Sequence, residues 1–327
     1  MNNAPFFSVV IPTKNRSSLL KMSLLSVLSQ VFLDREVVVV DNSDDEEAEI
    51  NYELCKRFKE VKYCRTGGLS MAENWDHAFL IAKGKYICLL SDRLQWSSTT
   101  LLTRVYDTIC ITEAPIVSWK WCNNPSYGHA PPSRTGLTGL YMSKEILELF
   151  RNMDWLTFTY MSPRGLNSAI HQDVVSGIRQ KLGRFCYMLS PDYTAAFNSL
   201  IATELLAHID ANEVYSNGLN ESNGAKNSRS YASSKAACCA YNVDESYLKD
   251  LPVKIMTVRN TLVADYLNIS KKWGRNEKIT NLNIQGYFEW LRADLKSLSE
   301  TPKHEMIDLV DSYNDAAKKY SVPLVKL

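Results

Sequence analysis

Short apolar runs and longer stretches of helical period alternate along the N-terminal part of the chain. The apolar runs predict strands at 7–12, 36–40, 61–65 and 86–90. Apolar residues at helical spacing between these runs predict helices at 17–30, 44–58 and 69–82. This order favours an α/β fold, in which helices flank a doubly wound, mostly parallel sheet with right-handed crossovers.

Polar residues stand at the ends of three of these predicted strands. Thr13 follows the first apolar run, Asp41 follows the second, and Asp92 comes shortly after the fourth. In open parallel sheets, ligands bind beyond the carboxyl ends of the strands. We therefore expect these three side chains to share one site.

The middle and the end of the chain follow a less regular pattern. We expect strands at 115–121 and 185–189, helices at 143–150, 168–182 and 195–209, and a long loop at 122–139. Residues 216–235 are rich in Ser, Asn and Gly, which predicts a linker or a lid, and helical spacing returns from Asp244 onward. We therefore expect an α/β domain at 1–199 and a mainly helical C-terminal region at 200–327.

The composition narrows the classes of partner. The chain has 327 residues, is 45% hydrophobic and has a formal net charge of +1, which gives no electrostatic reason to expect a nucleic-acid partner. Eight cysteines without a Cys-x-x-Cys pair suit reduced thiols in the cytoplasm. The chain shows neither a signal-peptide pattern nor an uncharged run of about 18 residues, so we expect a cytoplasmic protein without a membrane span.

Four short motifs follow one another in the N-terminal half. They are IPTKNR at 11–16, VDNS at 40–43, GLSMAEN at 68–74 and AKGKYI at 82–87. In this order and at this spacing, the chain resembles family 2 glycosyltransferases, whose nucleotide-binding fold is the GT-A type. The likeness covers roughly residues 6–195, a little over half of the chain.

The resemblance implies that a nucleotide-sugar donor binds at the strand ends. The residues that it assigns to donor contact are Pro12, Thr13, Asn15, Arg16, Asp41, Asn74, Asp92 and Arg93. Asp41 would accept a hydrogen bond from the base, and Asn74 would lie on a helix beside the nucleotide. Other interpretations stay open, because Asp41 also suits an Asx turn after a strand and Arg16 also suits a surface position at a helix start.

The metal-binding motif of the family is incomplete in this chain. Family members place Asp-x-Asp after the fourth strand to hold Mg²⁺ or Mn²⁺, whereas this chain has Ser91-Asp92-Arg93. Three interpretations follow. Asp92 still binds a metal ion while Arg93 points away, or Arg93 itself neutralises the donor phosphate, or the site is inactive.

The resemblance also implies a catalytic base on a helix that follows the long middle loop. Asp173 occupies the corresponding place, with the stabilisation of a helix N-terminus as its alternative role. His171 and Trp96 are candidate contacts for the acceptor or the sugar, although both residue types are more often structural. Lys120, Arg134 and Arg164 are candidate contacts for an acidic donor.

These expectations together describe an inverting glycosyltransferase. It would transfer a sugar from a nucleotide-sugar donor to a hydroxyl of a glycan or lipid-linked acceptor, in the biosynthesis of a bacterial surface polysaccharide. The C-terminal region would shape the acceptor site, form a homodimer, or rest on the inner face of the membrane. The alternative is a catalytically impaired nucleotide-binding scaffold, which the incomplete acidic motif suggests. The enzymatic interpretation requires Asp173 to lie near residues 13, 41 and 92.

Overall fold

The computed structural model describes residues 4–123, 135–187, 189–217, 223–241 and 243–326. The chain divides into two compact units. The first unit contains Met1–Leu147 and Leu156–Asn217, and the second contains Glu148–Trp155 and Gly218–Leu327. The boundary expected near residue 200 therefore lies after Asn217, and a short internal segment belongs to the C-terminal unit.

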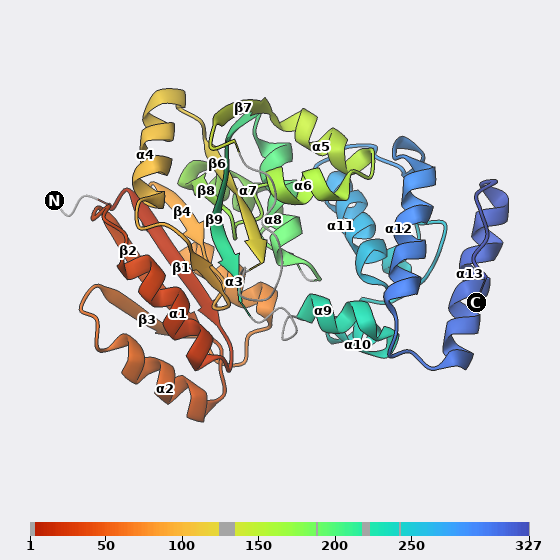
Figure 1. Ribbon diagram of the computed structural model, residues 1–327, viewed down its shortest axis with the longest axis horizontal. Coiled ribbons are helices and arrows are strands. Elements are labelled where there is room, and N and C mark those ends of the chain that lie inside the picture. The colour runs from red at the N-terminus through yellow and green to blue at the C-terminus, as the bar shows by residue number, and fades with distance from the viewer. Residues whose placement is uncertain (1–3, 124–134, 188, 218–222, 242, 327) are drawn as a thin grey trace. The chain divides into compact units, whose positions relative to one another are not determined.

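A single mixed sheet organises the first unit (Figure 1). Its first four strands are β1 (Phe7–Thr13), β2 (Arg35–Asp41), β3 (Val61–Arg65) and β4 (Tyr86–Leu89). β1 lies between β2 and β4 and runs parallel to both, and β3 adds to β2 in the same direction. Every residue of β1 is buried, as an apolar strand covered on both faces requires. The doubly wound arrangement expected from the sequence is confirmed.

The remaining strands extend the sheet on the other side of β4. They are β5 (Leu94–Trp96), β6 (Ile116–Asn123), β7 (Thr138–Met142), β8 (Ser168–His171) and β9 (Leu205–Ser216). The strand order is β3-β2-β1-β4-β8-β6-β9-β5, with β7 paired to β9. β8 runs antiparallel to both β4 and β6, so β6 and its parallel neighbour β9 point the same way as β4.

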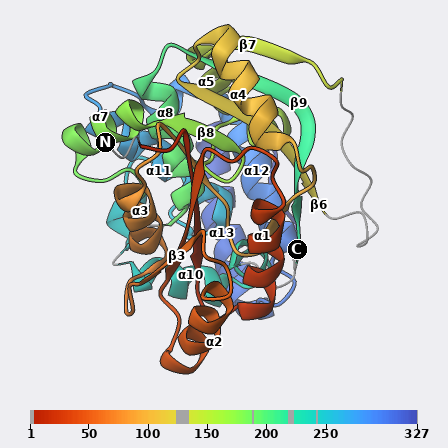
Figure 2. The ribbon, with the colours of Figure 1, turned by 90° about the vertical axis from the view of Figure 1, so that its left-hand side faces the viewer.

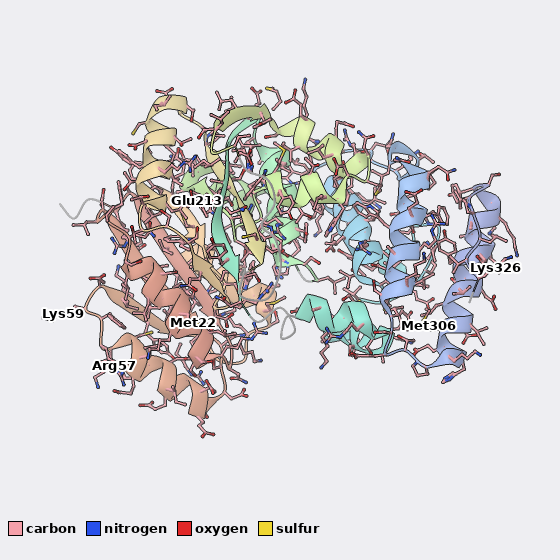
Figure 3. The ribbon with its side chains drawn as sticks, viewed as in Figure 1. Met22, Arg57, Lys59, Glu213, Met306 and Lys326 are labelled. Atoms are coloured by element: carbon pink, nitrogen blue, oxygen red, sulfur yellow. The ribbon has the colours of Figure 1, made fainter. Side chains whose placement is uncertain are left out.

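Helices cover both faces of this sheet. Those of the first unit are α1 (Ser17–Leu28), α2 (Asp45–Cys55), α3 (Met71–Ile81), α4 (Leu101–Thr112), α5 (Ser143–Arg151, which continues into the second unit), α6 (Trp155–Met161), α7 (Gln172–Leu182) and α8 (Pro191–Ala202). Figure 2 shows α1 and α4 on one face and α3 and α7 on the other. On α1, Leu20 and Leu24 are buried, whereas Met22 is 39% exposed on the outer side (Figure 3).

Three sequence predictions in the middle of the chain are wrong. The helix expected at 168–182 begins as strand β8 and becomes helical only at Gln172. The helix expected at 195–209 starts at Pro191 and ends at Ala202, and the chain then enters β9. Of the strand expected at 185–189, the described residues are not in a strand. β9 was missed because His208, Asn212 and Glu213 are polar yet buried, which breaks the apolar pattern of a core strand.

The second unit is helical in its described residues. Its elements are α9 (Asn223–Arg229), α10 (Tyr231–Ala240), η3 (Glu245–Leu248), α11 (Val258–Lys272), η4 (Ile279–Asn281), α12 (Ile284–Ser297) and α13 (Lys303–Lys319). Residues 223–235, expected as a linker or lid, therefore lie mostly in α9 and α10. Tyr266 of α11 and Tyr287 of α12 are fully buried in the core of this unit. Among the described helices, none has the length and apolar character needed to span a bilayer.

Candidate functional site

The first part of the site lies where β1 and β4 end. Thr13, the last residue of β1, donates a hydrogen bond from Oγ1 to the carboxylate of Asp92 over 3.0 Å. Arg16 extends back from the start of α1, and its Nη1 lies 3.4 Å from the other Asp92 oxygen. Only 4% of Asp92 is exposed, and this burial raises the pKa of its carboxyl against the opposing effect of Arg16. The structure thus brings together three of the residues expected from the sequence.

Asp41 lies beside Thr13, and protein donors hold its carboxylate. It accepts the Ser43 backbone N–H at 2.7 Å, the Asn51 side-chain amide at 2.9 Å and the Tyr63 hydroxyl at 2.8 Å. The residue is completely buried. These contacts correspond to the Asx-turn alternative, in which Asp41 shapes the loop after β2.

The side-chain amides of Asn74 and Asn15 hold the loops at the carboxyl ends of β1 and β2, which we call the rim of the sheet. Asn74 donates to the Val40 carbonyl at 3.0 Å, and its carbonyl oxygen accepts the Thr66 hydroxyl at 2.6 Å. Asn15 has a positive φ of 54° and donates from its side chain to Asp44 at 2.7 Å. Both residues therefore hold loops at the carboxyl ends of the strands, and Pro12 lies one residue inside β1, opposite Val40.

A second part of the site gathers around Arg164, between α6 and β8. Its Nη1 lies 3.3 Å from a carboxylate oxygen of Asp192, the second residue of α8. The guanidinium also lies 5.0 Å from the ring centroids of both Trp121 and Tyr193. This arrangement combines an ion pair with two cation–π contacts in a largely buried setting.

Arg93 connects the two parts of the site. Its Nη1 donates to the Ser216 hydroxyl, at the end of β9, over 2.9 Å. Burial lowers the pKa of Arg93, while Asp192 and Asp92 oppose that shift and Arg16 and Arg164 add to it. Arg93 follows the end of β4, and Gly165, the neighbour of Arg164, lies against Leu89 at that same end, so these charged side chains gather at the carboxyl ends of the strands. We call Arg16, Asp92, Arg93, Arg164 and Asp192 the charged cluster.

The prediction that Asp173 faces this site is wrong. β8 runs antiparallel to β4 and pairs His171 with Tyr86, the first residue of β4. Asp173 therefore lies where β4 begins, with its side chain 90% exposed, whereas Asp92 follows the end of β4. β1 rises about 3.3 Å per residue, so its length separates the two edges by on the order of 20 Å. The reversal of the chain at β8 was not visible in the sequence pattern.

His171 and Trp96 have structural surroundings. His171 accepts the Asp173 backbone N–H at 3.1 Å, which makes it the N-cap of α7, and its ring packs 4.9 Å from that of Tyr86. Burial lowers the pKa of His171. Trp96 lies in β5 and is only 4% exposed, so its ring is not available to a sugar.

Asp192 is the main residue of the site that the sequence interpretation missed. A signal was present, because Ser190-Pro191-Asp192 has the proline and the acidic residue typical of a helix start. Burial raises the pKa of Asp192, against the opposing effects of Arg164 and Arg93. Of the other candidates, Lys120 pairs with Asp210, and Arg134 lies outside the described residues.

The donor set of the charged cluster does not fit a divalent cation. Mg²⁺ and Mn²⁺ favour several oxygen ligands, whereas each carboxylate here already faces a guanidinium. Within the described ranges, no group of three or more His, Cys, Asp or Glu side chains is arranged to hold a metal ion. The assignment of Asp92 as a metal ligand therefore has no support from its surroundings.

Comparisons with known proteins agree with this architecture. The family model described as glycosyl transferase family 2 matches residues 8–179, more than half of the chain. The crystal structure of S. aureus TarS 1–349 superimposes with a TM-score of 0.53 at 15% identity, over 96% of this chain and 91% of that chain. The same fragment in complex with UDP-GlcNAc gives 0.53 at 14% identity over the same shares.

The longer crystal structure of S. aureus TarS gives a TM-score of 0.52 at 15% identity, over 96% of this chain and 55% of that chain. No curated protein sequence matches the chain. At these identities the structures support the GT-A type of fold, and the family match supports the enzyme class. The chain therefore belongs to glycosyl transferase family 2 and is a glycosyltransferase with a GT-A type fold.

Proposed function

We propose that this glycosyltransferase inverts the configuration of the transferred sugar and that Asp192, not Asp173, is its catalytic base. The donor would be a nucleotide sugar, and the acceptor a hydroxyl of a glycan or lipid-linked molecule. The observation that carries the proposal is the ion pair of Asp192 with Arg164, whose neighbour Gly165 lies against Leu89 at the end of β4.

Inverting transfer requires a base that takes the proton of the attacking hydroxyl on the side opposite the leaving phosphate. A positioned carboxylate contributes typically about 10²- to 10⁴-fold to such a step. Asp192 suits this role because burial raises the pKa of its carboxyl, which makes the carboxylate a stronger proton acceptor. Arg164 favours the ionised form that the reaction requires.

The rim around Thr13 supports a nucleotide site. Asn15, Asn74 and Asp41 keep the loops after β1 and β2 in fixed positions through hydrogen bonds within the protein. A preorganised rim lowers the entropy cost of binding a flat base and its ribose. Backbone groups of these loops, more than the buried Asp41 carboxylate, would contact the donor.

The acceptor side of the proposal includes the second unit. We propose that its helices shape the acceptor site, mediate a homodimer or contact a membrane surface, in the biosynthesis of a bacterial surface polysaccharide. The S. aureus TarS fragment is known in complex with UDP-GlcNAc, so this donor belongs in the first test panel. The competing function, a nucleotide-binding scaffold without turnover, draws on the presence of Arg93 where family members have a second acid.

The test compares two aspartates at helix starts. Purified protein is incubated with UDP-, GDP-, dTDP- and CMP-sugars and a panel of acceptors, and released nucleotide and product mass are measured. Asp192→Asn should lower kcat by about 10²- to 10⁴-fold. Asp173→Asn, the matched control at an exposed helix start, should retain activity within about twofold because surface changes have small effects.

Proton NMR of the product reports its anomeric configuration. A product with retained configuration, or an Asp192→Asn variant as active as the natural protein, would remove the proposed mechanism. Nucleotide binding without transfer to any acceptor would favour the scaffold function.

A further inference from the structure

Asp92 is the only acidic residue in the turn at 90–93, between β4 and β5. Donor groups of the protein already form hydrogen bonds to both of its carboxylate oxygens. These oxygens accept from Thr13 Oγ1 at 3.0 Å, Ser91 Oγ at 3.2 Å and Arg16 Nη1 at 3.4 Å. A cation that used Asp92 would have to displace these donors and would lie next to a guanidinium. Two positive charges at this distance repel each other, which opposes binding of a cation at Asp92.

The charged cluster instead has an excess of positive charge. Three guanidiniums, of Arg16, Arg93 and Arg164, face two carboxylates, of Asp92 and Asp192. Arg164 is buried, and Arg16 and Arg93 are partly buried. Positive charge that is withdrawn from water is unfavourable unless an anion completes it. The cluster therefore has the charge that a bound phosphate group would balance.

Two of the guanidiniums have capacity to bind such a group. Arg93 bonds through Nη1 to a neutral hydroxyl, that of Ser216, at 2.9 Å. Arg164 has a side chain only 6% exposed, and its Nε has no hydrogen-bond partner among the described residues. A buried donor without a partner is uncommon and carries a free-energy cost. Planar guanidiniums match phosphate oxygens in bidentate fashion.

We propose that Arg93 and Arg164 bind the phosphate of the nucleotide-sugar donor in place of a divalent cation, so that the protein binds and uses its donor without metal. This inference rests on the proposed function. In the transfer step, the bond from the anomeric carbon to the phosphate oxygen breaks and leaves its electron pair on that oxygen. The acceptor oxygen forms the new bond, its proton passes to Asp192, and the guanidiniums stabilise the charge on the phosphate.

The first experiment measures binding of CMP, UDP, GDP and dTDP by isothermal titration calorimetry, in excess EDTA and again with Mn²⁺. We expect at least one nucleotide to bind with an affinity that differs by less than about twofold between the two conditions. The CMP arm distinguishes recognition of one phosphate from recognition of two. Binding that appears only with Mn²⁺ overturns the inference and leaves the proposed function intact.

The second experiment tests the two arginines. Arg93→Lys keeps the charge but removes the planar fork, and it should weaken nucleotide binding in EDTA at least tenfold, as should Arg164→Gln. Arg57→Gln is the matched control, because Arg57 is exposed and lies after α2 (Figure 3). Thermal unfolding without nucleotide checks that each variant is folded. Unchanged affinity in a folded Arg93→Lys variant overturns the inference.

Failure of the proposed function and failure of the inferred phosphate site would give different results. Metal-independent binding that depends on Arg93, combined with no sugar transfer, contradicts the proposed function and supports the phosphate site. Sugar transfer that EDTA abolishes and Mn²⁺ restores supports the function and overturns the inference.

Discussion

Asp192, the proposed base, pairs with the buried guanidinium of Arg164, and we expect this pairing to make the rate depend on pH. Burial raises the pKa of Asp192 above its ordinary value of 3.8, and Arg164 opposes that effect. A base must be ionised to act, so activity is present above the raised pKa and is lost as pH falls through it. We expect the acidic limb of the kcat profile above pH 3.8, at a position that depends on Arg164.

The measurement is kcat against pH for the natural protein and for Arg164→Gln. Removing the guanidinium takes away the favourable charge, so the acidic limb should move to higher pH. A limb at the same pH in both proteins would exclude Asp192 as the titrating base. Saturating donor separates this effect from the weaker binding expected for the variant.

We expect the stability of the folded protein also to depend on pH, because of His208. It is buried in β9, its Nδ1 lies 2.9 Å from the Ser118 hydroxyl, and burial lowers its pKa from 6.5 to about 4. Between these values the unfolded chain binds a proton that the folded protein does not, so stability is full above about pH 6.5 and falls toward pH 4. The loss at pH 5 should be about 2 kcal/mol.

Urea unfolding at pH 5 and pH 7.5 measures this difference in the free energy of unfolding. His208→Gln should reduce the difference, whereas His304→Gln, at an exposed position of α13, should leave it unchanged. An equal difference in all three proteins would mean that other groups cause the dependence.

At the scale of the elements, continuous apolar runs were predictable and mixed ones were not. The sequence placed β1, β2, β3 and β4 to within one or two residues. β1, β2 and β4 are almost wholly buried apolar runs, whereas β3 is a partly buried strand at the edge of the sheet. The same reasoning located Thr13 and Asp92 at the end of the sheet where they meet. Local pattern is sufficient where a strand is covered on both faces.

The rest of the sheet depends on contacts between distant segments. β8 has four residues, and no local signal shows that it runs antiparallel to β4. That one direction decides which edge Asp173 occupies, and for this reason the sequence interpretation put Asp173 at the wrong edge of the sheet. Asp192 could be recognised as a site residue only after Arg164 and Arg93 were located beside it.

Gly84 provides a test of how closely β4 must approach β1. Its N–H donates to Ser8 Oγ at 2.7 Å, and an added Cβ would lie 2.4 Å from the Ser8 backbone nitrogen. Gly84→Ala should therefore destabilise the protein by roughly 1–3 kcal/mol, because a backbone atom cannot move aside.

Gly177→Ala is the matched control for this measurement. Gly177 lies in α7, and an added Cβ there meets nothing within 4 Å. Alanine favours a helix over glycine by about 0.5–1 kcal/mol, so this variant should be slightly more stable. Urea unfolding that gave both variants the same sign would contradict the close approach of β1 and β4.

At the scale of the whole molecule, the two units cannot be separated by a single cut. The second unit includes Glu148–Trp155, and Phe150 from this segment is fully buried, with its ring 5.0 Å from Tyr266 and 5.7 Å from Trp290. A chain that stops at Asn217 would lose these two rings and expose apolar surface. We expect it to aggregate and to bind a hydrophobic dye, as measured by light scattering and dye fluorescence.

Substituting the uncovered side chains should restore solubility. In the shortened chain, Phe150→Ser together with Met153→Ser should reduce dye binding, because Met153 belongs to the same internal segment and is 7% exposed. A shortened chain that is monomeric and unfolds at the same Tm as the full chain would contradict the assignment of this segment to the second unit.

The position of Trp121 beside Arg164 has a consequence for spectroscopy. The indole of Trp121 lies 5.0 Å from the guanidinium, so its excited state experiences the field of that cation directly. An anion docking against Arg164 would reduce that field and shift the emission of this one indole. If the proposed phosphate site is correct, Trp121 would act as an intrinsic optical reporter, and donor occupancy could be followed in real time without attaching a dye.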